Sequence, residues 1–251
     1  MSPSFQPFPR DSLRNLALGE HEIQVWSAEI DQTEERVSHL EAILSPDERE
    51  RAARFVFARD RIRFVVCRSV LRKLLGGYTG EPADSIGFEY GAKGKPELAG
   101  RGYCFNLAHS ESLAVIGFAR SGPLGVDVER IRPMPDGESI VNRFFSSAER
   151  TVFAVLPTEL KLKAFFNGWT RKEAFVKALG DGLHVALDSF DVSISPGDEP
   201  RLLSFEGDCC KAADWSLFHL EPKPGYVAAL AIAGRGWKVT AWSLNMGSLI
   251  T

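Results

Sequence analysis

The chain has 251 residues, of which 25% are charged, and a formal net charge of −3 at pH 7. This length allows one large domain or two modest ones, and the slightly negative charge gives no general attraction to nucleic acid. The four cysteines include no Cys-x-x-Cys pair, which argues against zinc or disulfide frameworks and is typical of a reducing compartment. No apolar run is long enough to span a membrane. We therefore expect a cytoplasmic protein without a membrane partner.

The N-terminal quarter predicts a short series of elements. Residues 1–20 are polar and contain prolines, so we expect a loosely held arm. The alternation in residues 22–30 predicts a strand, and the apolar spacing in residues 31–44 predicts a helix. Ser45 and Pro46 then form the start signal of a second helix.

A basic segment follows. Residues 49–73 contain eight arginines and one lysine, with apolar residues between them at helical spacing. One interpretation is a solvated helical face. The other is a phosphate-binding surface, because the guanidinium group suits phosphate oxygens.

Two carboxylates lie on one predicted strand in the middle of the chain. A Ser-Gly-Pro turn joins the predicted strands 113–119 and 124–129. Side chains alternate along a strand, so Asp127 and Glu129 share a face, about 6.6 Å apart along the backbone. Such a pair repels itself unless a cation lies between the groups, and carboxylates that leave positions open to water suit Mg²⁺. The alternative is the solvated side of an edge strand.

The C-terminal half contains a long predicted helix over residues 158–179. Phe165, Trp169, Glu173 and Lys177 recur every four residues, so they share one stripe that begins as core and ends as two charges. Charge on a core-facing row is costly unless it meets a metal, a phosphate or a partner. The alternative is an exposed Glu173–Lys177 ion pair.

A faint internal repeat relates the two halves. The sequence of residues 75–88 resembles that of residues 179–192, and the strand 113–119 resembles residues 226–233. The sequence therefore predicts a duplicated α+β unit, with halves at residues 1–123 and 124–251. A fold of this kind places its ligand cleft between the halves.

Two of these motifs together resemble a known family. Gly-Val-Asp-Val-Glu at 125–129, followed about forty residues later by Trp-x-x-Lys-Glu-Ala-x-x-Lys at 169–177, resembles the signature of the 4′-phosphopantetheinyl transferases. The length and two-halved layout look like the surfactin-type (Sfp-type) branch rather than the half-length, trimeric holo-acyl-carrier-protein synthases. The resemblance extends from about residue 44 to residue 233. It implies a pseudo-two-fold α+β fold with the active site between the halves.

The resemblance also implies an activity. Such an enzyme moves 4′-phosphopantetheine from coenzyme A to a serine of an acyl or peptidyl carrier protein and releases adenosine 3′,5′-bisphosphate. We expect it to act as a monomer, with no nucleic-acid partner. By resemblance, Asp127, Glu129 and Glu173 would bind Mg²⁺, or Mn²⁺ as the alternative metal. Glu173 or Glu149 would be the general base, and Lys177 would stabilise the leaving phosphate. Glu149 also lies in the first turn of a predicted helix after a serine cap, which alone would explain it.

The coenzyme A contacts implied by the resemblance lie in the first half. Two departures from the family pattern accompany them: Glu48 stands where some members have a basic residue, and Ala108 where most have serine. The implied contacts are Arg51 and His109 with the 3′-phosphate, Arg54 in the same arginine motif, and Lys95 and Pro96 around the adenine.

Two functions of other classes compete with this interpretation. A non-catalytic module of the same fold that binds coenzyme A or a carrier protein is expected to have lost a metal carboxylate, and none is lost here. An RNA-binding protein using residues 49–73 is expected to have exposed aromatic residues among the basic ones and a basic isoelectric point, whereas this chain has a pI near 6.0. The sequence does not identify the carrier protein, the metal or the general base.

Overall fold

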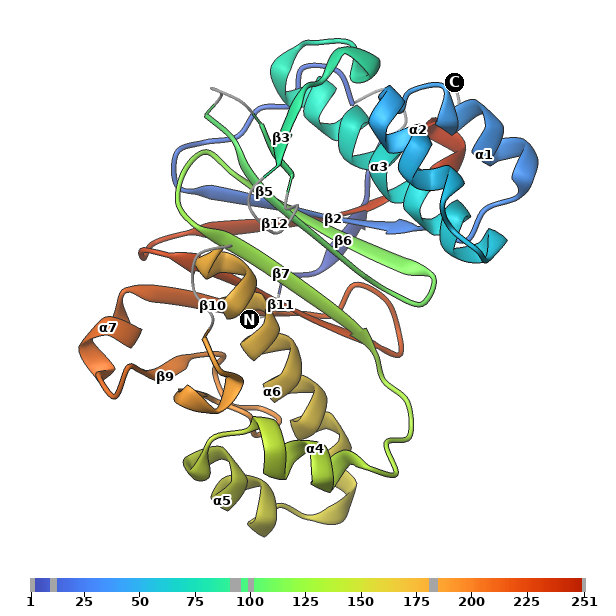
Figure 1. The fold of residues 1–251 in the computed structure, drawn as a ribbon. Helices are drawn as coiled ribbons and strands as arrows, with labels where there is room; N and C mark the ends of the chain where they lie inside the picture. The colour runs from blue at the N-terminus through green and yellow to red at the C-terminus, as the bar shows by residue number, and fades with distance from the viewer. Residues whose placement is uncertain (1–2, 10–12, 91–95, 99–101, 181–184, 250–251) are drawn as a thin grey trace.

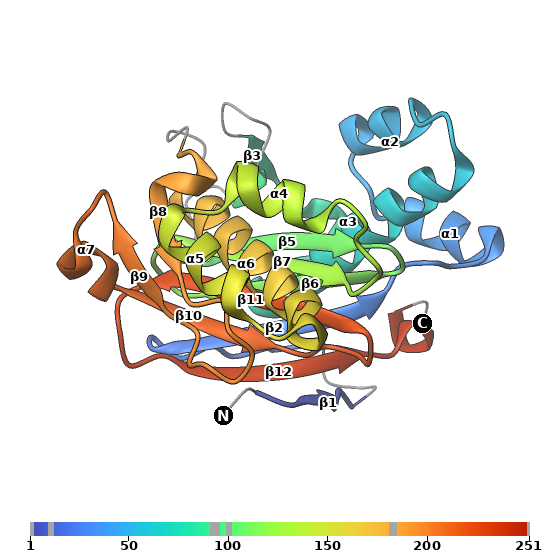
Figure 2. The ribbon, with the colours of Figure 1, turned by 90° about the horizontal axis from the view of Figure 1, so that it is seen from below.

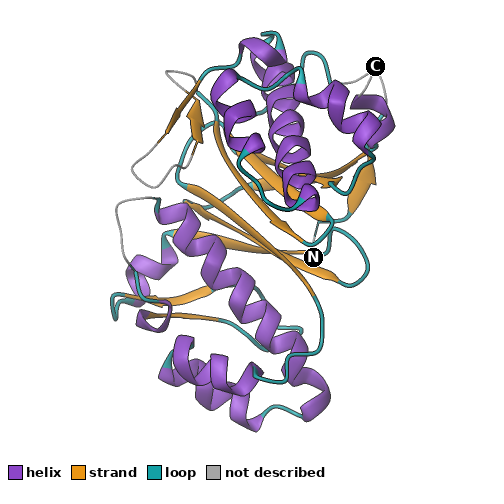
Figure 3. Ribbon diagram, turned by 45° about the vertical axis from the view of Figure 1, so that its right-hand side comes forward, coloured by secondary structure: helices purple, strands orange, loops and turns teal. Residues whose placement is uncertain are grey.

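The computed structural model describes residues 3–9, 13–90, 96–98, 102–180 and 185–249. This part of the chain forms four layers, with two sheets packed face to face and helices on both outer sides (Figures 1 and 3). The predicted α+β fold with two similar halves is confirmed.

The two main sheets differ in size. The first has five strands in the order β1-β12-β2-β6-β5, and the second has three in the order β10-β11-β7. Two short hairpins, β3-β4 and β8-β9, lie beside them. The bounds are β1 Phe5–Pro7, β2 Glu22–Glu29, β3 Phe88–Tyr90, β4 Pro96–Leu98, β5 Cys104–Ser110, β6 Leu113–Ala119, β7 Leu124–Arg130, β8 Phe190–Val192, β9 Leu202–Phe205, β10 Trp215–Leu220, β11 Tyr226–Ala233 and β12 Lys238–Leu244.

The helices divide between the two outer layers. The first three lie beside the first sheet, and α6 lies against the second sheet with α4 and α5 packed on it (Figure 1). The start signal at Ser45 is confirmed, because α2 begins at Pro46 with a capping box between Ser45 and Glu48. The bounds are α1 Glu34–Glu41, α2 Pro46–Ala53, α3 Ala58–Thr79, α4 Gly137–Phe144, α5 Ser147–Val155, α6 Thr158–Leu179 and α7 Cys209–Ala213, with short 3₁₀ turns at Ala83–Ser85, Leu187–Ser189 and Met246–Leu249.

The predicted internal repeat is present in the topology. In the first half, β2, β6 and β5 are antiparallel neighbours, and in the second half β7, β11 and β10 repeat that order. The long helices α3 and α6 each have 22 residues and are each followed by a 3₁₀ turn and a short hairpin. Between the sheets, alternate strand residues such as Val25, Val115, Val126 and Leu230 form a shared apolar layer.

The N-terminal segment corrects one prediction. Residues 1–20 were expected to form a loosely held arm, but β1 pairs in parallel with β12 at the edge of the first sheet (Figure 2). The ring of Phe8 lies 4.6 Å from that of Trp26 and 5.2 Å from that of Trp242. Aromatic burial therefore holds a segment whose composition looked polar.

The C-terminal strand crosses between the halves. β12 pairs in parallel with β2, so residues 124–251 contribute a strand to the first sheet. The boundary between the two halves at residue 123 remains a prediction.

The strands β5 and β7 lie side by side where the two sheets meet (Figure 1). Side chains of β5 join them: the amide of Val126 donates to Asn106 Oδ1 at 2.9 Å, and Ser110 Oγ donates to Glu129 Oε2 at 2.8 Å. This seam fixes the position of the carboxylate-bearing strand relative to the first half.

A glycine sets how closely α6 approaches β7. A Cβ atom on Gly125 would lie 2.1 Å from the carbonyl oxygen of Ala174 and 2.4 Å from the amide nitrogen of Ala178. Only a residue without a side chain allows the helix backbone to rest directly on the strand. Gly125 shares its strand face with Asp127 and Glu129, so the same approach brings α6 over both carboxylates.

We predict that Gly125→Ala destabilises the protein by about 1–3 kcal/mol, because the added methyl group must push α6 away. Denaturant unfolding of the purified variant measures this loss. Gly87→Ala is the matched control, since a Cβ there meets open space. Equal unfolding free energies for both variants and the wild type would contradict the close contact.

Candidate active site

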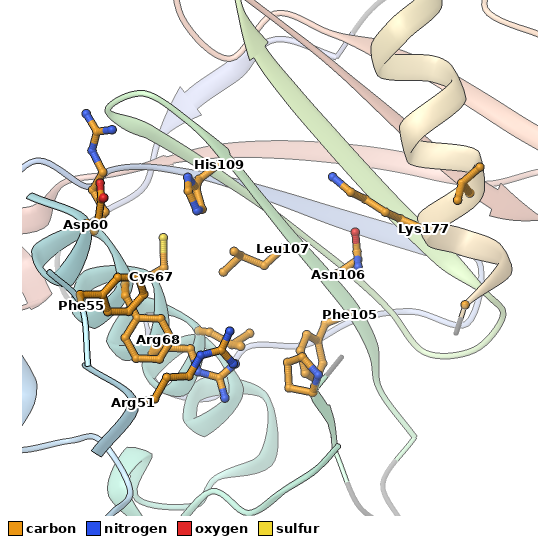
Figure 4. Close-up of a pocket in the computed structure, with 16 residues that line it drawn as sticks. Arg51, Phe55, Asp60, Cys67, Arg68, Phe105, Asn106, Leu107, His109 and Lys177 are labelled. Carbon is orange, nitrogen blue, oxygen red and sulfur yellow. The ribbon is translucent and has the colours of Figure 1, made fainter. Parts of the chain in front are cut away.

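A cavity of about 620 Å³ lies between the two halves, as predicted. Figure 4 shows its lining residues, which come from α2, α3, β4, β5 and the turn that holds Phe55 on one side, and from the end of α6 on the other. Its polar lining is mainly cationic. The charged and aromatic lining residues are Arg51, Phe55, Asp60, Arg63, Phe64, Arg68, Phe105, His109 and Lys177.

Asp127 and Lys177 make the central contact of the site. Lys177 Nζ donates to Asp127 Oδ1 at 2.6 Å, which connects α6 to β7. Asp127 is only 6% exposed, so the interpretation of a solvated edge strand is wrong for this residue. The second oxygen, Oδ2, is buried and has no hydrogen-bond partner among the described residues.

The electrostatics of Asp127 follow from its surroundings. Burial raises the pKa of its carboxyl group to about 7, and the negative charges of Glu129 and Glu173 raise it as well. Lys177 opposes these effects. The carboxylate is therefore short of positive charge even with the lysine in contact.

The donor set at this point suits a hard divalent cation. The unpaired Oδ2 of Asp127 is an orphaned acceptor, and two further carboxylates are close enough to shift its pKa. In the described part of the chain, no choice of one oxygen from each of Asp127, Glu129 and Glu173 brings the three oxygens within 4.8 Å of one another. Mg²⁺ commonly uses one or two carboxylates and keeps several waters, so a tight protein cage is not required.

Glu48 organises the opposite wall of the cavity. Its carboxylate is 1% exposed and accepts from Arg68 Nε at 2.6 Å and from Arg72 Nε at 2.5 Å. Arg68 lines the cavity, whereas Arg72 is buried and donates to the Ala83 and Ile86 carbonyl oxygens. Glu48, which departs from the family pattern, is thus a buried acid that holds Arg68 at the cavity wall.

The remaining arginines of residues 49–73 have different roles. Arg54 pairs with Glu50 at 2.5 Å and is 72% exposed, away from the cavity lining. Arg61 pairs with Glu34 and Glu41. Each interpretation of the basic segment therefore holds for some of its residues. Arg54 and Arg61 belong to a solvated face, whereas the cavity is lined by Arg51, Arg63 and Arg68.

His109 and Ala108 lie on opposite faces of β5. The ring of His109 lines the cavity, and its pKa is lowered by burial and by the positive charges of Arg63 and Lys177. Ala108 packs into the apolar layer between the sheets. A serine hydroxyl in that place would lie among apolar side chains. Pro96 lines the cavity, and Lys95 lies outside the described residues.

Glu149 occupies the core of the second half. It is 2% exposed, and its oxygens contact Lys172 Nζ at 2.8 Å, the Ser146 amide at 2.8 Å and the Val192 amide at 2.7 Å. Burial raises the pKa of Glu149, and the Lys172 charge and the two amides oppose that shift. Its catalytic role stays a prediction, because each of these contacts also has a structural purpose.

Several residues at the site were not predicted as functional from the sequence. Arg68, Asn106 and Ser110 act through contacts with residues distant in the chain. A weak signal existed for Arg68, since Phe64, Arg68 and Arg72 recur four residues apart on one helix face. Nothing local marks Asn106 or Ser110 as seam residues.

Comparison with known proteins decides the family. A family model described as "4'-phosphopantetheinyl transferase, N-terminal" matches residues 26–120, and one described as "4'-phosphopantetheinyl transferase superfamily" matches residues 123–231. The chain belongs to the 4′-phosphopantetheinyl transferase superfamily. The predicted family is confirmed, and with it the expectation of a transferase rather than a non-catalytic module.

Individual relatives agree over most of the chain. It is 40% identical to the 4′-phosphopantetheinyl transferase HetI of Nostoc sp., over 91% of this chain and 94% of the relative. It is 30% identical to the transferase psf-1 of Bacillus pumilus, over 74% and 80% of the two chains. The transferase Sfp of Bacillus subtilis is 29% identical, over 64% and 71%. Among the described residues of this phosphopantetheinyl transferase, no helix is long and apolar enough to cross a bilayer.

We predict that Glu48→Ala destabilises the protein by about 3–5 kcal/mol, because it leaves two arginines without their buried counter-charge. Glu50→Ala, two residues along the same helix, removes an exposed partner and should cost at most about 1 kcal/mol. Urea unfolding of both variants provides the comparison. Similar losses in the two would show that Glu48 has no special place in the fold.

Proposed function

We propose that this phosphopantetheinyl transferase uses Mg²⁺ to move 4′-phosphopantetheine from coenzyme A to a serine of an acyl or peptidyl carrier protein. The observation that carries the proposal is a cation-lined cavity that ends at a lysine bound to a buried, half-satisfied carboxylate. The cations suit a ligand with several phosphates. The unpaired carboxylate oxygen suits a metal beside them.

The metal site would consist of Asp127, Glu129 and Glu173. Mg²⁺ bound there would neutralise charge on the pyrophosphate of coenzyme A. Lys177 contacts Asp127 and lines the cavity, which supports the proposal that its ammonium group would stabilise negative charge on the leaving phosphate. Ser110 holds Glu129 by one oxygen and leaves the other oxygen for a ligand.

Glu173 is a better candidate for the general base than Glu149. Glu173 is partly exposed and influences the pKa of Asp127, so it lies near the metal carboxylates. Glu149 is fully buried, and both of its oxygens accept hydrogen bonds. We propose that Glu173 accepts the serine proton, directly or through water, and that Glu149 positions Lys172 and the start of α5.

The first half would bind the rest of coenzyme A. Arg51 and His109 are proposed to hold the 3′-phosphate, with Arg63 and Arg68 beside them in the cavity wall. Pro96 would contact the adenine. Lys95 and Arg54 remain predictions for the same ligand.

The direct test is mass spectrometry of an apo carrier protein incubated with the enzyme, coenzyme A and Mg²⁺. We predict a mass increase of one phosphopantetheine unit, absent when Mg²⁺ is chelated. Asp127→Ala should abolish the increase while the far-ultraviolet circular dichroism spectrum is retained. Modification at the wild-type rate by this variant would refute the metal assignment.

A further prediction concerns the contacts to the 3′-phosphate of coenzyme A. A charge-assisted hydrogen bond is worth about 1.5–3 kcal/mol, on the order of ten- to a hundred-fold in affinity. Arg51→Ala and His109→Ala should therefore lower kcat/KM for coenzyme A strongly but for dephospho-coenzyme A very little. Arg59→Ala is the control, because that arginine is 68% exposed and pairs with Asp60. An equal loss with both donors would show that these residues do not contact the 3′-phosphate.

A further inference from the structure

A second cavity, of about 590 Å³, lies along the first half of α6. It shares no lining residue with the coenzyme A cavity in the described part of the chain. Lys163, Asn167 and Arg171 line it at four-residue spacing, so they form one stripe of the helix. His219 on β10 and the loop at residues 197–200 complete the wall.

Arg171 is a buried cation that forms no ion pair with any of the described residues. It is 2% exposed and donates from one terminal nitrogen to the Ser193 carbonyl oxygen at 2.5 Å and to Ser193 Oγ at 3.1 Å, both neutral acceptors. Its Nε is buried and has no hydrogen-bond partner in the part of the chain that the structure describes. A buried charge without a compensating anion is costly, and structures seldom keep one without a use.

The charges nearby do not neutralise it. Burial lowers the pKa of Arg171 to about 10, and only the exposed Asp198 acts in the other direction. Glu221 is engaged elsewhere, 3.2 Å from His219 Nε2 and 3.7 Å from Lys163 Nζ. Glu199, which also lines the cavity, pairs with Arg201. Arg171 is therefore the charged group at the buried end of the cavity.

Asn167 places an unpaired acceptor next to this donor. It is 2% exposed, and its Nδ2 makes a long contact of 3.4 Å with the Ile194 carbonyl oxygen. Its Oδ1 is buried, and none of the described residues donates a hydrogen bond to it. Arg171 and Asn167 thus hold, one helical turn apart at the cavity wall, a buried cationic N–H donor and a buried neutral oxygen acceptor that the described residues leave unsatisfied.

We propose that this second cavity binds inorganic phosphate, whose ionised forms at neutral pH keep at least one O–H group. A phosphate oxygen accepts from Arg171 Nε, and a protonated phosphate oxygen donates to Asn167 Oδ1. A carboxylate supplies only the first of these contacts, because it has no O–H group when ionised. Lys163 at the wall adds a positive charge. Burial lowers the pKa of His219, so its neutral ring offers a hydrogen bond rather than a charge.

The test is thermal unfolding of the full-length protein with inorganic phosphate, against sodium chloride and sodium acetate at equal ionic strength and neutral pH. A ligand that binds only the folded state raises the midpoint temperature. Arg51→Ala serves as a control for phosphate bound in the coenzyme A cavity. Asn167→Asp is the main variant, because it places a carboxylate beside Arg171 that replaces the ligand's charge.

We expect phosphate, but not acetate, to raise the midpoint of the wild type and of Arg51→Ala. Asn167→Asp should be more stable than the wild type without phosphate and should bind phosphate about tenfold more weakly or worse. If Asn167→Asp fails to fold, Asn167→Leu replaces it and should also lose the phosphate effect. The proposal is overturned if acetate stabilises equally, if phosphate has no effect, or if the effect is lost in Arg51→Ala and kept in the Asn167 variants.

Discussion

The contact between Lys177 and Asp127 is the interaction on which the rest of the site depends. It joins the last turn of α6 to the middle of β7, and it exists because Gly125 lets the helix lie directly on the strand. One carboxylate oxygen is taken by the lysine, and the other is left buried and unpaired. A carboxylate in this state costs stability unless a cation completes its surroundings.

Because the pKa of Asp127 is raised, the contribution of this group to the stability of the fold depends on pH. The folded protein holds the proton up to about pH 7, whereas the unfolded chain releases it near 3.8. Between these values the folded state binds more protons, so this group's contribution to stability is largest at low pH and is lost as the pH rises toward 7. The metal-free protein therefore carries a destabilising group at neutral pH, and a bound cation would remove that penalty.

The two halves contribute to one cavity because of contacts that tie them together. Asn106 and Ser110 join β5 to β7 where the sheets meet, and β12 returns to the first sheet. On the far wall, Glu48 holds Arg68 in place through a buried ion pair. The cavity is thus bounded on one side by Arg68, which Glu48 fixes, and on the other by Lys177, which contacts Asp127.

Patterns local in the sequence predicted much of this arrangement. Alternation placed Asp127 and Glu129 on one face, helical spacing placed Lys177 in line with the core row, and the faint repeat predicted the paired topology. The partners could not be predicted, because they come from distant segments: Lys177 meets Asp127 fifty residues away, and Glu48 meets Arg68 and Arg72 on the next helix. The N-terminal segment was mispredicted since its pairing strand, β12, lies at the other end of the chain.

The most direct measurement is the titration of Asp127 by carbon-13 nuclear magnetic resonance in protein with labelled aspartate, assigned through Asp127→Asn. The account predicts a midpoint near pH 7 in the metal-free enzyme. Added Mg²⁺ and coenzyme A should shift it to a lower pH, because a bound cation favours the ionised carboxylate. A midpoint at the ordinary aspartate value without metal, or one that Mg²⁺ and coenzyme A leave unchanged, would contradict a half-satisfied carboxylate at the centre of the site.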